Sequence, residues 1–375
     1  MSALLPDVDP DGLLEFSVVF TDRSLNHMSQ SFQGVMRDIS TILKDVYNAD
    51  HTAIIPGGGT YAMEAVARQF ATNKRALVIR NGWFSYRWSQ IFAAGSIPSD
   101  ETVMVAQRTG NAPQAAFTPA PIEEVTARIA GERPSAVFAP HVETASGMIL
   151  PDEYIKSAAQ AAHNAGGIFV LDCIASGCAW VDMKALGVDV LISAPQKGWS
   201  ASPCAGLVMM NDRAREMVAK GSSTSFAADL KAWAGIMDAY EAGGHAYHAT
   251  MPTDALRKFR DIMIETQDYG FEKLREAQWE LGNRVRAALA ERGVKSVAAE
   301  GFGAPGVVVS FTTDAHIKTG AKFAEIGVQI AAGVPLQCDE GTEYSSFRLG
   351  LFGLDKLYDV DRAVASVEAA LDQVL

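Results

Sequence analysis

Residues 167–198 of the chain read GIFVLDCIASGCAWVDMKALGVDVLISAPQKG. They contain two short apolar runs, Ile168–Leu171 and Val188–Ser193, and runs of this length and composition predict buried β-strands. Asp172 follows the first run directly, and Lys197 lies in the small-residue loop after the second. Because open α/β folds bind ligands at the carboxyl edge of the sheet, the stretch predicts an acidic and a basic side chain at one such edge.

Further apolar runs alternate with helical patterns on both sides of this stretch. We expect the other strands of the same sheet at residues 51–55, 76–80, 103–106, 136–139 and 207–210. A helix is expected over residues 32–47, where apolar residues recur at helical spacing. Strands that alternate with helices predict an α/β fold with a mostly parallel, seven-stranded sheet between helices.

The pattern changes near Pro252. Long, charged helices are expected from there to about Gly293, and they are followed by a smaller α+β unit. In this unit we expect strands at 306–311 and 347–352, a helix after Ala315 and a final helix from Val360. The predicted parts are an N-terminal segment (1–25), a large domain (26–255), and a connecting helix with a small C-terminal domain (256–375).

The amino-acid composition and net charge limit the kinds of molecule that the protein is expected to bind. Hydrophobic residues make up 48% and charged residues 20% of the 375 residues, as in soluble globular proteins. The formal net charge of −12 argues against binding to nucleic acid or to an anionic membrane. Four cysteines in mostly apolar surroundings indicate reduced thiols, and no apolar run is long enough for a membrane span. We therefore expect a cytoplasmic protein with small-molecule partners.

A glycine-rich turn, Gly57–Thr60, lies between the first expected strand and a helix that begins near Tyr61. Backbone N–H groups in such a turn, together with a helix N-terminus, form an anion site, and phosphate is the natural ligand. The spacing also fits the loose dinucleotide fingerprint or a plain tight turn. The dinucleotide alternative is disfavoured because the next strand ends in Arg80-Asn81, with no carboxylate for a ribose.

Asp172 and Lys197 are more informative as a pair than singly. Alone, Asp172 is equally well explained as a helix N-cap, and Lys197 as a surface lysine. Pyridoxal 5′-phosphate (PLP) needs a lysine amine for its Schiff base and a carboxylate that keeps the ring nitrogen protonated. The pair therefore favours a PLP enzyme in which Lys197 carries the cofactor and Asp172 holds the pyridine nitrogen.

The chain resembles the class V aminotransferases of PLP fold type I over nearly its whole length. Similar members include alanine–glyoxylate, serine–glyoxylate and 2-aminoethylphosphonate aminotransferases. The matching stretches are PGGGTYAMEAV, RNGWFSYR, HVETASGMILP, VLDCIASG, ISAPQKGWSASPCAGL, AYHATMP and FRLGLFG. The resemblance implies a large domain with the seven-stranded sheet and a smaller C-terminal domain.

The resemblance also implies roles for individual residues. Phosphate would be bound by Gly58, Gly59, Thr60 and Gln196, and the cofactor ring would be contacted by Phe84, Thr144 and Ile174. Tyr247 and Thr250 would reach the phosphate of a neighbouring subunit, which implies a homodimer with shared active sites. Arg348 would bind the α-carboxylate of the amino acid, although a strand-end arginine is the commoner explanation of such a residue alone.

The implied reaction is transfer of an amino group from a small amino acid, such as alanine or serine, to a keto acid such as glyoxylate or pyruvate. It would follow a ping-pong mechanism in which Lys197 is both anchor and general base. Alternatives are a PLP lyase, or a 2-aminoethylphosphonate or phosphoserine aminotransferase. Related lyases usually carry histidine where this chain has Gln196.

Two further features bear on the site. The N-terminal segment is expected to line the active site, but Phe16–Arg23 replaces the usual Gly-Pro-rich sequence and leaves the substrate open. Arg23 is a candidate for binding a second acidic group of the substrate, or is a solvated loop arginine. His141 and Glu143 have the spacing of a zinc deaminase motif, but Cys204 lacks its second cysteine, so no metal site is expected.

Overall fold

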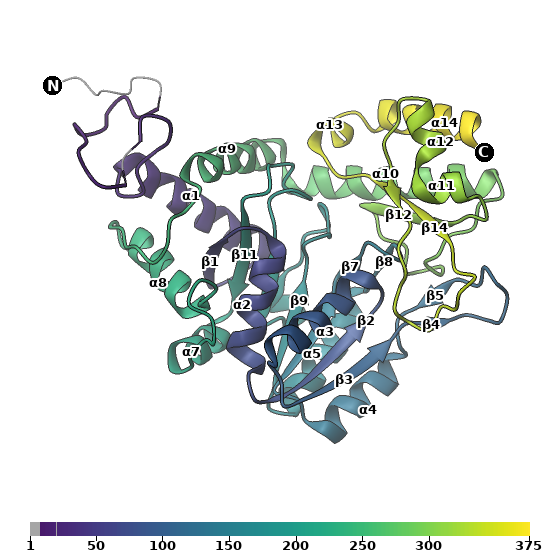
Figure 1. The fold of residues 1–375 in the computed structure, drawn as a ribbon, viewed down its shortest axis with the longest axis horizontal. Helices are drawn as coiled ribbons and strands as arrows, with labels where there is room; N and C mark the ends of the chain where they lie inside the picture. Colours follow the sequence, from purple (N-terminus) through teal and green to yellow (C-terminus); the bar gives the residue numbers. More distant parts are fainter. Residues whose placement is uncertain (1–7, 20) are drawn as a thin grey trace.

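The computed structural model describes residues 8–19 and 21–375 and contains a seven-stranded sheet among helices (Figure 1). In spatial order its strands are β1 (His51–Pro56), β11 (Ala205–Met210), β10 (Val190–Ser193), β9 (Ile168–Asp172), β6 (Ala136–Pro140), β2 (Arg75–Arg80) and β3 (Asp100–Val105). Strand β11 is antiparallel to both neighbours, and the other pairs are parallel. The expected mostly parallel, seven-stranded α/β sheet is confirmed.

Burial explains the apolar runs of the sequence. Every residue of β6, β9, β10 and β11 is buried, so these strands need apolar side chains on both faces. Helix α2 packs on β11, α3 on β2 and α5 on β9. The helices of this part are α1 (Gln30–Tyr47), α2 (Gly59–Ala71), α3 (Trp83–Gly95), α4 (Ile122–Glu132), α5 (Asp152–Asn164), α6 (Met183–Leu186), α7 (Asp212–Lys220) and α8 (Leu230–Glu241).

The long charged region after Pro252 consists of two helices, α9 (Thr253–Tyr269) and α10 (Phe271–Glu291). Gly270 separates them with a φ of 109°, a conformation that residues with a Cβ rarely adopt. The C-terminal unit, drawn in yellow-green in Figure 1, has a three-stranded antiparallel sheet in the order β12 (Val307–Phe311), β14 (Ser346–Gly350), β13 (Ala331–Ala332). Its helices are α11 (Ala315–Thr319), α12 (Ala321–Glu325), α13 (Leu354–Leu357) and α14 (Val360–Val374).

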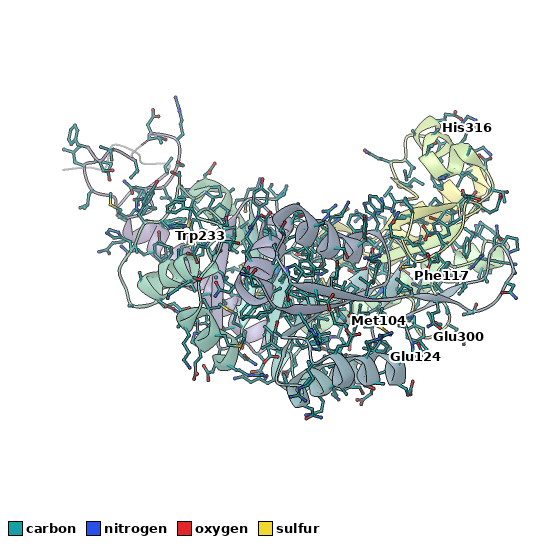
Figure 2. The ribbon with its side chains drawn as sticks, turned by 60° about the horizontal axis from the view of Figure 1, so that its bottom comes forward. Met104, Phe117, Glu124, Trp233, Glu300 and His316 are labelled. Carbon is teal, nitrogen blue, oxygen red and sulfur yellow. The ribbon has the colours of Figure 1, made fainter. Side chains whose placement is uncertain are left out.

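Two short hairpins join the large sheet to the C-terminal unit. Strands β4 (Gln107–Arg108) and β5 (Phe117–Thr118) form one, and β7 (Val142–Glu143) and β8 (Met148–Ile149) form the other. Phe117, labelled in Figure 2, is fully buried, and its N–H donates to the Val297 carbonyl oxygen at 2.8 Å. The sequence did not predict these hairpins. The domain boundaries at residues 25 and 255 stay a prediction.

Helix α3 begins at Trp83 and is capped by a residue from another element. Its preceding residue, Gly82, has no side chain to accept a hydrogen bond. Instead, the Glu143 carboxylate accepts from Phe84 N at 3.2 Å, from Ser85 N at 2.8 Å and from Ser85 Oγ at 2.7 Å. Burial raises the pKa of Glu143, whereas these hydrogen bonds oppose the shift. A carboxylate at this position satisfies free N–H groups and complements the helix dipole.

We expect Glu143→Ala to lower the free energy of unfolding by about 2–4 kcal/mol, because it leaves buried donors at the start of α3 without an acceptor. Urea unfolding followed by circular dichroism measures the change. Glu291→Ala, at an exposed position of α10, is the control and should change stability by less than about 0.5 kcal/mol. Equal effects of the two substitutions would contradict the capping role.

Candidate active site

A cleft of about 410 Å³ lies at the carboxyl edge of the large sheet and is closed on one side by the C-terminal unit. Most of the residues predicted from the sequence line it: Gly59, Thr60, Phe84, Thr144, Asp172, Ile174, Gln196, Lys197 and Arg348. The C-terminal unit adds Val307, Ala331, Gly350 and Phe352. The cleft therefore gathers residues from strand ends, helix starts and loops that are far apart in the sequence.

Asp172 is the last residue of β9 and is 8% exposed. Its Oδ1 accepts a hydrogen bond from Ile174 N at 2.9 Å, within a turn, so the helix N-cap alternative is wrong. Its Oδ2 has no hydrogen-bond partner among the described residues. Burial raises the pKa of Asp172 to about 7; the Ile174 hydrogen bond and nearby Arg87 partly oppose the shift. This buried carboxylate can accept a further hydrogen bond from a cationic group.

Lys197 reaches the same cleft from the loop after β10. Close packing fixes this loop, because a Cβ on Gly198 would lie 2.1 Å from the Gly177 carbonyl oxygen. No ion pair of the described residues includes Lys197, and its Nζ lies 5.2 Å from the centroid of the Phe352 ring. Burial lowers the pKa of Lys197, and the charge of Arg348 lowers it further. A lysine with a lowered pKa has more free amine for nucleophilic attack.

The glycine-rich turn forms the start of α2. Gly58 is the N-cap residue with an extended backbone, and no side chain caps the helix. A Cβ on Gly59 would lie 2.4 Å from Ile174 Cδ1, so a larger residue here would displace the Ile174 side chain in the cleft. Gln196, across the turn, makes no hydrogen bond among the described residues, and its Oε1 is buried. The free N–H groups at the start of α2 and the Nε2 group of Gln196 are donors that suit a phosphate group, whereas Gln196 Oε1 can only accept.

Two arginines flank Phe84 in the cleft. The guanidinium carbon of Arg348 lies 5.6 Å from the centroid of the Phe84 ring, and that of Arg87 lies 5.4 Å from it. Arg348 Nε donates to the Ala332 carbonyl oxygen at 2.8 Å. No described hydrogen bond uses the two terminal nitrogens of Arg348, so they are available to a carboxylate in two-pronged geometry.

Tyr247 and Thr250 do not line this cleft. They lie between α8 and α9, where Tyr247 is 58% exposed and its hydroxyl is 3.1 Å from Thr250 Oγ1. Their predicted contact with the phosphate of a neighbouring subunit stays a prediction.

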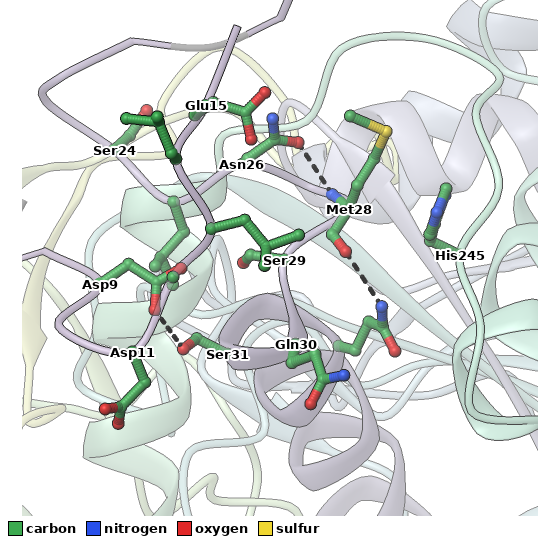
Figure 3. A pocket seen from close by; sticks show the side chains of 15 residues that line it. Asp9, Asp11, Glu15, Ser24, Asn26, Met28, Ser29, Gln30, Ser31 and His245 are labelled. Atoms are coloured by element: carbon green, nitrogen blue, oxygen red, sulfur yellow. Dashed lines mark hydrogen bonds between the residues drawn. The ribbon is translucent and has the colours of Figure 1, made fainter. Parts of the chain in front are cut away.

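The N-terminal segment also lies away from the cleft of its own chain. It lines a separate hollow of about 670 Å³ with the start of α1 and His245 (Figure 3). Within this hollow Asp9 Oδ1 accepts from Ser31 Oγ at 2.7 Å. Arg23 is exposed and pairs with Asp22 at 3.4 Å. Residues 1–7 and Phe20 of the predicted segment lie outside the described residues.

Sequence reasoning gave no role to Arg87 or Glu143, although both belong to quoted stretches. Arg87 lies one helical turn after Phe84, and this spacing was the available signal. In the sequence, Glu143 and His141 together have the spacing of a zinc motif, which points away from a capping role for Glu143. The feature that could have pointed to Glu143 is an acidic residue close to a buried strand. Among the described residues no group of three or more His, Cys, Asp or Glu side chains is placed to hold a metal ion.

Comparison with known proteins finds similar chains among the aminotransferases. Alanine–glyoxylate aminotransferase 1 of Saccharomyces cerevisiae is 28% identical over 276 residues, which are 69% of this chain and 67% of the yeast protein. The 2-aminoethylphosphonate–pyruvate transaminase of Syntrophobacter fumaroxidans is 26% identical over 351 residues, 89% of each chain. The crystal structure of an alanine–glyoxylate aminotransferase from Nostoc sp. superposes with a TM-score of 0.77 at 20% identity, covering 92% of this chain and 89% of that one.

No helix in the described part of the chain has the length and apolar character needed to cross a bilayer.

The family model described as aminotransferase class-V matches residues 15–333. This match, which spans most of the length, shows that the chain belongs to the class-V aminotransferase family, as an aminotransferase with the α/β fold of the fold type I PLP enzymes.

Proposed function

We propose that the protein transfers an amino group from a small α-amino acid to a small keto acid such as glyoxylate or pyruvate, with PLP as its cofactor. The observation that carries the proposal is the cleft in which Asp172 and Lys197 lie together with the anion-binding start of α2. The names of the yeast and Syntrophobacter relatives support glyoxylate or pyruvate as acceptors.

In this proposal Lys197 Nζ would hold the cofactor covalently, and the Asp172 carboxylate would keep its ring nitrogen protonated. Bound PLP supplies an electron sink for the substrate's Cα–H bond and a carrier for the amino group. As a free amine, Lys197 Nζ would take the proton from Cα of the donor as general base. A positive ring nitrogen beside Asp172 would favour the ionised carboxylate, whose pKa is raised to about 7 mainly by burial and also by the charge of Glu143.

Supporting residues orient the substrate and exclude water. Gly58, Gly59, Thr60 and Gln196 would bind the phosphate, while Phe84, Thr144 and Ile174 would surround the ring. Arg348 would bind the α-carboxylate through its two terminal nitrogens, because its Nε is already held by the Ala332 carbonyl oxygen. Keto acids carry the same carboxylate, so one arginine can serve both halves of a ping-pong cycle.

We propose that the active unit is a homodimer with shared sites. Large apolar side chains are exposed on the N-terminal segment and near Tyr247, among them Leu13, Phe16, Val18 and Phe226. Exposed apolar groups of this size are typical of surfaces that pack against a second copy. Tyr247 and Thr250 lie at this surface and would complete the partner's phosphate site.

The four cysteines are buried and unpaired, which supports a reducing compartment such as the cytoplasm.

We expect Lys197→Ala to remove the visible absorbance of tightly bound cofactor after gel filtration and to lower kcat at least about 100-fold, because it removes anchor and base together. Spectra and initial rates with alanine and glyoxylate measure both effects. Lys220→Ala, at the exposed end of α7, is the control and should retain absorbance and rate. A wild-type spectrum in Lys197→Ala would contradict the proposal.

Arg348→Ala should weaken donor binding about 10- to 100-fold in the half-reaction with alanine or serine, since a charge-assisted, two-pronged contact is lost. The measurement is the donor concentration that gives half the maximal rate of the cofactor's spectral change. 2-Aminoethylphosphonate has no α-carboxylate and is the comparison donor. Unchanged half-saturation with every α-amino acid would refute the assignment of Arg348.

Shared sites can be tested by mixing two defective subunits, Lys197→Ala and the double variant Tyr247→Phe/Thr250→Val. Each homodimer should be nearly inactive. If Tyr247 and Thr250 act across the interface, a hybrid dimer has one intact site and one doubly defective site. Random co-assembly should then restore about a quarter of wild-type activity, because half of the dimers are hybrids with one working site. No recovery in hybrids isolated by two affinity tags would contradict sharing.

A further inference from the structure

Arg87 occupies a position between the anion-binding turn and the aromatic wall of the cleft. It lies on α3, one turn after Phe84, and lines the cleft. Its Nη1 donates to Thr60 Oγ1 at 3.0 Å, and its guanidinium carbon lies 5.4 Å from the centroid of the Phe84 ring. No ion pair of the described residues includes Arg87. Two contacts therefore hold this guanidinium while its charge stays unneutralised.

The charges that line the cleft indicate what Arg87 binds. Three cationic side chains line it: Lys197, Arg348 and Arg87. In the proposed function Lys197 binds the cofactor's aldehyde carbon, and Arg348 binds the substrate carboxylate. The phosphate is close to a dianion at neutral pH, whereas a helix N-terminus contributes only about half a positive charge. Thr60 and Gln196 are neutral, so Arg87 is the remaining cation of this chain's cleft that can balance the phosphate.

The hydrogen bond to Thr60 also sets the direction of the threonine hydroxyl. An oxygen that accepts from Arg87 Nη1 keeps its own O–H free to donate. The hydroxyl can then donate to a phosphate oxygen at the start of α2. Arg87 thus acts on an anion at this turn both by its charge and by orienting Thr60.

We propose that Arg87 is a phosphate-binding residue of the cofactor site, held in place by Thr60 and by the face of Phe84. The inference rests on the proposed function, since it names a further contact for the same cofactor. It also assigns Arg87 to the cofactor and not to a second acidic group of the substrate.

The test compares two ligands that differ only in the phosphate. Apoprotein of the wild type and of Arg87→Gln is titrated with PLP and with pyridoxal, which has the same ring and aldehyde. Quenching of tryptophan fluorescence reports binding without any turnover. We expect Arg87→Gln to raise the Kd of PLP about 10- to 100-fold and to leave that of pyridoxal within about twofold. Arg87→Lys, which keeps the charge, should lose less affinity for PLP than Arg87→Gln.

Arg68→Gln is the matched control, because Arg68 lies on α2 but pairs with Glu64 and donates to Thr224 outside the cleft. It should bind both ligands as the wild type does. An unchanged Kd of PLP in Arg87→Gln, or an equal rise for both ligands, would overturn the inference. If Arg87→Gln fails to fold, the test uses Arg87→Lys instead. The ratio of its Kd for PLP to its Kd for pyridoxal, compared with that of the wild type, then decides whether Arg87 binds the phosphate. A wild-type apoprotein that binds neither ligand would instead refute the proposed function.

Discussion

The burial of the Asp172 carboxylate at the end of β9 is the constraint on which the rest of the site depends. An ionised carboxylate in apolar surroundings is costly unless it is paired, and here the described residues supply one hydrogen bond, from Ile174 N. The strand that carries Asp172 is central and wholly buried, so the side chain cannot move into water without disrupting the sheet. Ile192 of β10 is its neighbour in register, and the loop after β10 brings Lys197 to the same edge.

A second buried carboxylate, Glu143, stabilises the other wall of the cleft. It anchors the start of α3 and thereby fixes the backbone of Phe84, whose ring faces the cleft. The two acids interact, because the charge of Glu143 raises the pKa of Asp172. Glu143 likewise opposes the lowering of the Arg348 pKa by burial. The charges of the cleft are therefore coupled in pairs: Glu143 acts on the pKa of Asp172 and of Arg348, and Arg348 acts on that of Lys197.

Apolar runs predicted the sheet well, because buried parallel strands leave an unambiguous signal in the sequence. The same reasoning singled out Asp172, at the end of one such strand, and Lys197, in the loop after the next, and both line the cleft. It missed the hairpin β4–β5, whose strands have two residues each, and gave no role to Arg87 or Glu143. Arg87 contacts Thr60, and Glu143 contacts the start of α3. Both contacts join segments that are remote in the chain, and local sequence patterns do not show which remote segments lie close together. The roles predicted for Tyr247 and Thr250 involve a second chain and stay a prediction.

The distribution of cations also bears on which substrates fit. If Arg348 binds the α-carboxylate and Arg87 the phosphate, as proposed, the described residues that line the cleft include no further arginine or lysine for a second acidic group besides Lys197. Arg23, the other candidate for that task, is exposed and pairs with Asp22. A dicarboxylic substrate would therefore have to bury one carboxylate without a cationic partner. Removing the partner of a buried charge costs about 3–5 kcal/mol, and we expect a penalty of the same size here. Glyoxylate, pyruvate, alanine and serine carry a single carboxylate and avoid this cost, so the charge pattern of the cleft itself favours small monocarboxylic partners.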